Sequence, residues 1–166
     1  LIIAHRGDNE HYPEQTAAAY ESAFSVGADG VETDVRLTRC GELVCIHDRF
    51  LNRVSDGSGK VSTCTMDDLS CLNFGSEDCP QPVLTFPEFL EIGEAYPDRH
   101  LFIETKHPSR YGVMLEEQIV RQLSYFGLLE SERVHIISFN PVSIQRIRRM
   151  APRLDRIWLR QLRYLW

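Results

Sequence analysis

Short apolar runs recur along the chain, and several of them end in charged or imidazole side chains. The runs at residues 2–4 and 43–46 are followed by His5-Arg6 and His47-Asp48, and residues 101–103 lead into Glu104. Apolar runs of this length are typical of buried strands. Because parallel α/β sheets place their chemistry at the carboxyl ends of the strands, the pattern predicts a site at that edge.

Segments with helical periodicity separate these runs. Two Thr residues, Thr65 and Thr85, each precede an acid by three residues, which is the spacing of a capping box and predicts a helix start. Asn140-Pro141 is a typical N-cap followed by an N1 proline. We expect strands at 1–4, 31–35, 43–47, 101–105, 134–138 and 157–159, longer helices at 14–26, 111–126 and 141–150, and helices opened by Thr65 and Thr85.

This order is a run of βα units in one domain over residues 1–166, with residues 49–100 as an inserted loop and helix segment over the site. About six strands fit two architectures. One is a doubly wound open sheet. The other is a TIM-type (β/α) barrel truncated after about six strands, because a complete barrel typically needs about 250 residues and the chain has 166.

Composition and net charge limit the kinds of molecule that the chain is expected to bind. Hydrophobic residues make up 43% and charged residues 25%, and the formal net charge is −6. An acidic chain is not expected to bind nucleic acid or an anionic membrane surface nonspecifically. A local cluster of Arg or Lys, or a bound metal, still permits an anionic substrate. No apolar run reaches the roughly 20 residues of a transmembrane segment.

The five cysteines are odd in number and contain no C-x-x-C pair. They indicate free thiols in a reducing compartment, so a cytoplasmic location is expected. A disulfide within residues 64–79 is the alternative. A secreted or periplasmic location stays open, because a leader could have been removed from the sequence.

The strand-end acids form the first candidate site. Glu32 and Asp34 lie two residues apart in a strand, so they share one face, and Glu104 ends another strand. Two carboxylates held together away from water repel each other, and a divalent cation removes that cost. Three carboxylates suit a hard cation, Mg²⁺ or Ca²⁺. The simpler alternative is that these are solvated acids at strand ends.

Two histidines and two cations accompany these acids. His5 and His47 both end apolar runs, and a pair beside an acid cluster suits general acid–base catalysis near neutral pH. Arg6 and Lys106 could hold phosphate oxygens, although Lys106 could instead pair with Glu104 or Asp34. Three further acids are expected in turn, supporting or capping roles: Glu14, Asp29 and Asp48.

The order and spacing of several motifs resemble the glycerophosphodiester phosphodiesterase family over the whole chain. The motifs are H-R-G at 5–7, P-E-Q-T at 13–16, G-A-D-G-V-E-T-D-V at 27–35, L-V-C-I-H-D at 43–48, I-E-T-K at 103–106 and S-F-N-P at 138–141. The resemblance implies a TIM barrel that uses one divalent cation to hydrolyse small-molecule glycerophosphodiesters to glycerol 3-phosphate and an alcohol.

The resemblance also implies residue roles. His5 and His47 would be the acid–base pair. The metal ligands would be Glu32, Asp34 and Glu104. Arg6 and Lys106 would contact the phosphate. The neighbouring glycerol hydroxyl would attack phosphorus with help from one histidine. The other histidine would protonate the leaving alcohol, and water would then open the cyclic phosphate.

Two departures from the family pattern bear on these expectations. Gln15 stands where the family usually has Asn, and the last two barrel strands have no counterpart here. The second departure predicts self-association through open sheet edges. The apolar residues from Leu159 to Trp166 would then face water, whereas a chain longer by about 70–90 residues would be monomeric and active.

Three other functions are compatible with the same residues. Lysophospholipase D and sphingomyelinase D activities share the acids and histidines but need an apolar cleft, for which Phe74 and residues 86–90 are candidates. An inactive binding fragment is the third. Choline release from glycerophosphocholine that EDTA abolishes would favour the diesterase.

Overall fold

The structure is a computed structural model that describes residues 1–160. Six strands form one sheet, in the order β1-β2-β4-β5-β6 with β3 added to β2. The strands are β1 (Ile3–His5), β2 (Gly30–Leu37), β3 (Leu43–Cys45), β4 (His100–Thr105), β5 (Val134–Ser138) and β6 (Asp155–Trp158). The longer helices are α1 (Ala17–Ser25), α3 (Phe86–Glu94), α4 (Met114–Tyr125) and α5 (Pro141–Met150).

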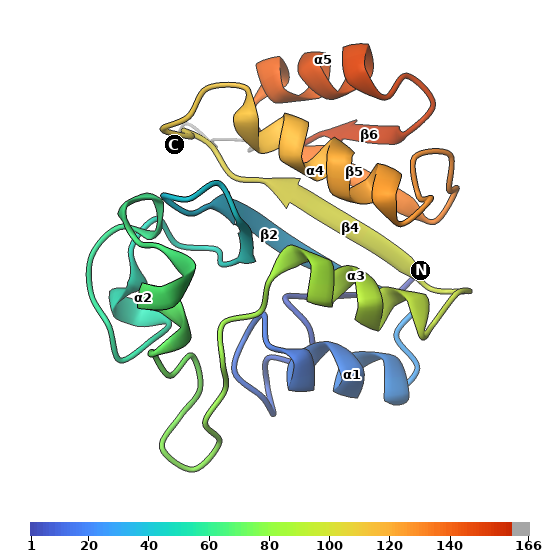
Figure 1. Ribbon diagram of the computed structural model, residues 1–166. Coiled ribbons are helices and arrows are strands. Elements are labelled where there is room, and N and C mark those ends of the chain that lie inside the picture. The colour runs from blue at the N-terminus through green and yellow to red at the C-terminus, as the bar shows by residue number, and fades with distance from the viewer. Residues whose placement is uncertain (161–166) are drawn as a thin grey trace, which may run out of the picture.

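The strand order decides between the two expected architectures. Leaving β3 aside, the remaining strands are parallel and follow one another in the order of the sequence. A doubly wound sheet would reverse direction partway along, and no reversal occurs in the part of the chain that the structure describes. The fold is therefore an open segment of a (β/α) barrel, which confirms the predicted class (Figure 1).

One strand direction was predicted wrongly. β3 runs antiparallel to β2, with Val35 opposite Cys45 and Leu37 opposite Leu43. The turn between the two strands is too short for the crossover that a parallel strand needs, so it forms a hairpin. His47 therefore does not lie at the end of a parallel strand, although the hairpin still brings it back beside β2.

Two hydrophobic cores lie beneath the site. The larger core packs one face of the sheet against the longer helices, and its members include Val31, Leu101 and Ile136. A smaller core holds the segment after β3, with Val44, Leu51, Leu69, Phe74 and Val83 among its members. Figure 1 places this second unit, which carries the short helix α2 (Met66–Ser70), at the end of the sheet to which the β4 arrow points.

Residues 49–100 thus divide between the two cores. Helix α3 buries Phe86, Phe89 and Leu90 in the larger core as an ordinary crossover helix. The capping boxes expected at Thr65 and Thr85 are present, and so is the cap at Asn140.

The remaining expectations are answered within residues 1–160. Helix α1 begins at Ala17, three residues later than expected, because Thr16 caps it. All five cysteines are free, which excludes the disulfide within residues 64–79 in this structure. No helix of the described chain is long and apolar enough to cross a membrane. Of the apolar C-terminal tail, residues 161–166 lie outside the described residues.

Candidate active site

The parallel register brings the strand-end residues together. His5 at the end of β1 lies opposite Glu32 of β2, and Asp34 of β2 lies opposite Glu104 of β4. Glu32 and Asp34 share the face of β2 that lies away from Val31 and the larger core. The His5 side chain is largely exposed, and its Nε2 atom lies 3.8 Å from Glu32 Oε2. Burial, followed by the charge of Arg6, lowers the pKa of His5.

The three acids form a buried cluster. One carboxylate oxygen from each of Glu32, Asp34 and Glu104 lies within 4.8 Å of the other two. Their exposed fractions are 6%, 0% and 9%. Burial and then repulsion from Asp34 and Glu104 raise the pKa of Glu32 to about 8, and burial also raises the pKa of Glu104. A cation at this position would relieve both the repulsion and the loss of hydration.

Unpartnered oxygens in this acidic cluster test whether it fits a metal ion. Both carboxylate oxygens of Glu32, and Asp34 Oδ1, are buried without a hydrogen-bond partner in the described chain. Lys106 Nζ lies 2.8 Å from Asp34 Oδ1 and 2.8 Å from Glu104 Oε1, but only the second contact has hydrogen-bond geometry. Oxygens on opposite sides of Ca²⁺ lie about 4.6–5.2 Å apart. The spacing and the free oxygens therefore fit a hard divalent cation.

His47 reaches the same edge from the loop after β3. The Ile46 amide donates to the Asp34 carbonyl at 3.0 Å, and Arg36 donates two hydrogen bonds to the His47 carbonyl at 2.9 and 2.6 Å. The His47 Nδ1 atom lies 2.6 Å from Asp48 Oδ1. A carboxylate at Nδ1 orients the imidazole and leaves Nε2 for another partner.

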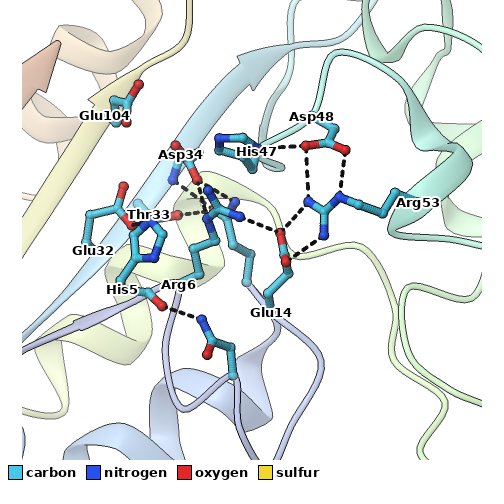
Figure 2. Close-up of polar contacts among 12 residues, drawn as sticks. His5, Arg6, Glu14, Glu32, Thr33, Asp34, His47, Asp48, Arg53 and Glu104 are labelled. Carbon is cyan, nitrogen blue, oxygen red and sulfur yellow. Dashed lines mark hydrogen bonds and ion pairs between the residues drawn. The ribbon is translucent and has the colours of Figure 1, made fainter. Parts of the chain in front are cut away.

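A chain of charged groups supports Asp48. Arg53 donates to both Asp48 and Glu14, and Glu14 also accepts from Arg6 (Figure 2). The hydrogen bonds from Arg53 are the largest influence on both acids and hold the pKa values of Asp48 and Glu14 below their usual range. Arg53 therefore ties the segment after β3 to the first loop. Sequence reasoning missed Arg53, because it lies 39 residues from Glu14.

Arg6 and Gln15 lie at the two ends of the first loop, and both contact Asp34 Oδ2. Both residues have positive φ, 62° and 57°. Arg6 Nε lies 3.3 Å from Asp34 Oδ2. The Gln15 amide donates to Asp34 Oδ2 at 2.9 Å and accepts from the Asp34 amide at 2.8 Å and from the Thr33 hydroxyl at 3.0 Å. Sequence reasoning noted Gln15 only as a departure from the family pattern and missed this role.

The fold and the site together define a class. A segment of a (β/α) barrel carries a buried carboxylate cluster at the carboxyl ends of its parallel strands, where barrel enzymes hold their active sites. His5, Arg6 and Lys106 lie at the same strand ends, and His47 reaches them from the loop after β3. Residues 5–163 match the model of the glycerophosphoryl diester phosphodiesterase family. The chain therefore belongs to this family.

Individual relatives of the chain carry the name of the same family. The chain is 41% identical over 174 residues to a probable glycerophosphodiester phosphodiesterase 1 of Mycobacterium tuberculosis, covering 96% of this chain and 64% of the relative. It is 35% identical to the glycerophosphodiester phosphodiesterase of Caldanaerobacter subterraneus, and the match covers 93% of this chain and 64% of that relative. The chain thus spans slightly less than two thirds of the length of these curated relatives.

Solved structures show the same fold. An Oleispira antarctica phosphodiesterase in complex with the product sn-glycerol-3-phosphate has a TM-score of 0.82 and 27% identity, over 93% of this chain and 64% of that one. A glycerophosphodiester phosphodiesterase from Agrobacterium tumefaciens has a TM-score of 0.81 and 27% identity, with the same coverage.

Proposed function

We propose that this chain carries the catalytic site of a glycerophosphodiester phosphodiesterase, which hydrolyses small-molecule glycerophosphodiesters to glycerol 3-phosphate and an alcohol. The observation that carries the proposal is the meeting of His5 and His47 with the buried acids at one end of the sheet. The product complex of the Oleispira relative supports glycerol 3-phosphate as the product.

In this proposal Glu32, Asp34 and Glu104 hold one divalent cation, Mg²⁺ or Ca²⁺. The unpartnered carboxylate oxygens of Glu32 and Asp34, with Glu104 close to both, support this assignment. The bound cation would supply positive charge for the phosphate oxygens and lower the repulsion between the acids. Arg6 and Lys106 add fixed positive charge beside Asp34, each next to a different carboxylate oxygen, and would orient the phosphate.

The two histidines move the protons. One imidazole takes the proton of the neighbouring glycerol hydroxyl while that oxygen forms a bond to phosphorus. The bond from phosphorus to the alcohol oxygen breaks, and the other imidazole protonates that oxygen. Water then adds to the cyclic phosphate with the proton transfers reversed, which opens the ring to glycerol 3-phosphate. Asp48 keeps His47 in one orientation throughout.

A direct assay tests the proposal. Choline release from glycerophosphocholine should be measured with added Mg²⁺ or Ca²⁺ and again with EDTA, alongside His5→Ala and His47→Ala. We expect release that requires the cation and falls about 10²–10⁴-fold in each variant. Tight binding of the diester without turnover would support a binding fragment instead.

The apolar cleft that a lysophospholipase D or sphingomyelinase D would need does not lie at the suggested residues. Phe86, Phe89 and Leu90 are buried in the larger core, with exposed fractions of at most 1%. Phe74 is 8% exposed and lines a cavity of about 540 Å³ whose other lining residues are mostly polar. Side chains that already pack against the protein interior cannot line an acyl-chain site without repacking. Phe86, Phe89 and Leu90 therefore supply no acyl-chain site in the described chain.

A further inference from the structure

A strongly basic cavity lies next to the acidic cluster. Its volume is about 490 Å³, and no acidic residue lines it among the described residues. Its lining includes five basic side chains: Arg36, Arg49, Lys60, Lys106 and Arg110. On a chain whose formal net charge is −6, such a cluster is a local reversal of sign. A concave wall of one charge concentrates ligands of the opposite charge.

Most of this positive charge is not neutralised by the protein. Lys106 pairs with Asp34 and Glu104, but the other four cations form no ion pair within residues 1–160. Lys60 lies over the Phe50 ring at 5.9 Å and Arg110 over the Tyr111 ring at 5.7 Å, which positions their charges without cancelling them.

Arg36 is one of these unpaired cations. It is partly buried and gives its hydrogen bonds to the uncharged carbonyl of His47. Arg49 lines the same cavity, so two guanidinium groups lie in it without an acidic residue in its described lining. Cations held this close gain stability when an anion binds between them.

The cavity shares its wall with the proposed catalytic site. Arg36 lies on β2 two residues beyond Asp34, on the same face, and Lys106 contacts both the acids and the cavity. Tyr111 and Ser62 also line the cavity, and the Tyr111 hydroxyl donates to the Ser62 carbonyl at 2.8 Å. A group bound here would be an extension of a substrate whose phosphate lies at Lys106.

We propose that this cavity binds a second phosphate group, carried on the alcohol that the diester releases. The inference rests on the proposed phosphodiesterase function and adds a substrate class to it. A guanidinium group can donate two parallel hydrogen bonds to two oxygens of one phosphate. The cavity contains three guanidinium groups, from Arg36, Arg49 and Arg110, and the ammonium group of Lys60.

Two diesters that differ by one phosphate provide the test. Glycerophosphoglycerol and its derivative phosphorylated on the terminal glycerol should be titrated by calorimetry with EDTA present, which prevents turnover. We expect the phosphorylated diester to bind about tenfold more tightly, and the advantage to shrink as salt is added. Arg49→Gln with Arg110→Gln should remove most of the advantage, because both are exposed side chains of the cavity.

The control is Arg121→Gln, an exposed arginine of α4 that lies outside the cavity and should keep the full advantage. Equal affinity for the two diesters, no binding of the phosphorylated diester, or an advantage that survives the double variant would overturn the proposal. So would an equal loss of affinity for glycerol 3-phosphate, which would place the first phosphate in this cavity. If the advantage is present but no diester is hydrolysed with metal added, only the proposed function fails.

Discussion

Gln15 and Asp34 are joined by a pair of hydrogen bonds: the Gln15 amide nitrogen donates to Asp34 Oδ2 at 2.9 Å, and the Asp34 backbone amide donates to Gln15 Oε1 at 2.8 Å. Both residues are buried, with exposed fractions of 4% and 0%. One side chain thus fixes both the backbone and the carboxylate of a proposed metal ligand.

Gln15→Leu should therefore reduce metal affinity about 10–100-fold, as replacing groups that orient metal ligands typically does. It should also lower the free energy of unfolding by about 1–3 kcal/mol, because the Asp34 amide loses its partner. Calorimetric metal titration and chemical denaturation measure the two effects. Gln118→Leu on α4 is the control. An unchanged metal affinity in Gln15→Leu would show that Asp34 needs no such support.

Gln15→Asn keeps the amide group but shortens the side chain, so it tests whether the amide or its distance from Asp34 matters. Asn tolerates positive φ better than Gln does, and Gln15 has φ 57°. The shorter side chain brings the amide less close to Asp34. We expect Gln15→Asn to keep more metal affinity than Gln15→Leu, and a loss as large as that of Gln15→Leu would show that distance, rather than the amide itself, decides the role.

Glu32→Gln tests the metal assignment directly. The change removes a charged oxygen ligand and some of the repulsion within the cluster, so the metal-free protein should fold normally while metal affinity falls. Calorimetric titration with Mg²⁺ and with Ca²⁺ measures the affinity, and circular dichroism checks the fold. Glu21→Gln on α1, away from the cluster, is the control. Wild-type affinity in Glu32→Gln would remove Glu32 from the ligand set.

The two histidines should behave as one unit. Each of His5→Ala and His47→Ala should lower kcat about 10²–10⁴-fold with little change in metal affinity. Because both act in the same sequence of proton transfers, the double variant should be only slightly worse than the worse single variant. Rate measurements on all four proteins decide this, and losses that simply multiply would mean that the histidines act independently.

The strand-end residues could be predicted because their signals are local. Glu32 and Asp34 share a face by the period of a strand, and parallel pairing places Asp34 opposite Glu104. The direction of β3 also had a local signal, since Cys40-Gly41-Glu42 leaves room only for a hairpin. The barrel order, however, depends on how distant strands pair, and the motifs supplied it only by resemblance.

The supporting contacts had no such signal. Arg53 reaches Glu14 across 39 residues, and Gln15 reaches Asp34 across 19. Nothing in the spacing of these residues distinguishes them from surface Arg and Gln side chains. Arg53 is positioned by the segment after β3, which the second core holds in place. Gln15 stands at a positive φ, which nothing in the sequence signals, and its side chain contacts Asp34.

A buried acid behind the site gives a pH-dependent prediction. Glu116 on α4 accepts from His107 at 2.9 Å and pairs with Arg146 at 3.4 Å. Burial raises the pKa of Glu116, but hydrogen bonds, chiefly from His107 and Ser143, outweigh it, and the pKa lies below the ordinary value of a glutamate. The folded state thus favours the charged form, so this stabilisation is complete above that value and is lost as the pH falls below it.

Glu116→Gln should therefore lower the free energy of unfolding by about 1.5–3 kcal/mol near pH 7. The difference from wild type should shrink between about pH 5 and pH 3. Chemical denaturation at several pH values measures it. Glu117→Gln is the matched control, since Glu117 lies in the same first turn of α4 but is exposed. A difference that stays constant with pH would show that Glu116 is not charged in the folded protein.

The open edges of the sheet predict self-association of the 166-residue chain. Among the described residues no strand pairs with the outer edge of β1 or β6, and Ile157 and Trp158 of β6 are 38% and 46% exposed. Unpaired strand edges with apolar side chains are templates for pairing with another chain. We expect dimers or larger species in size-exclusion chromatography with light scattering, increasing with concentration. Ile157→Lys should shift the population toward monomer, because a charge on an edge strand opposes pairing, whereas Val142→Lys on α5, an apolar helix position that is 49% exposed, should not. A monodisperse wild-type monomer at all concentrations would show that these edges are protected in solution.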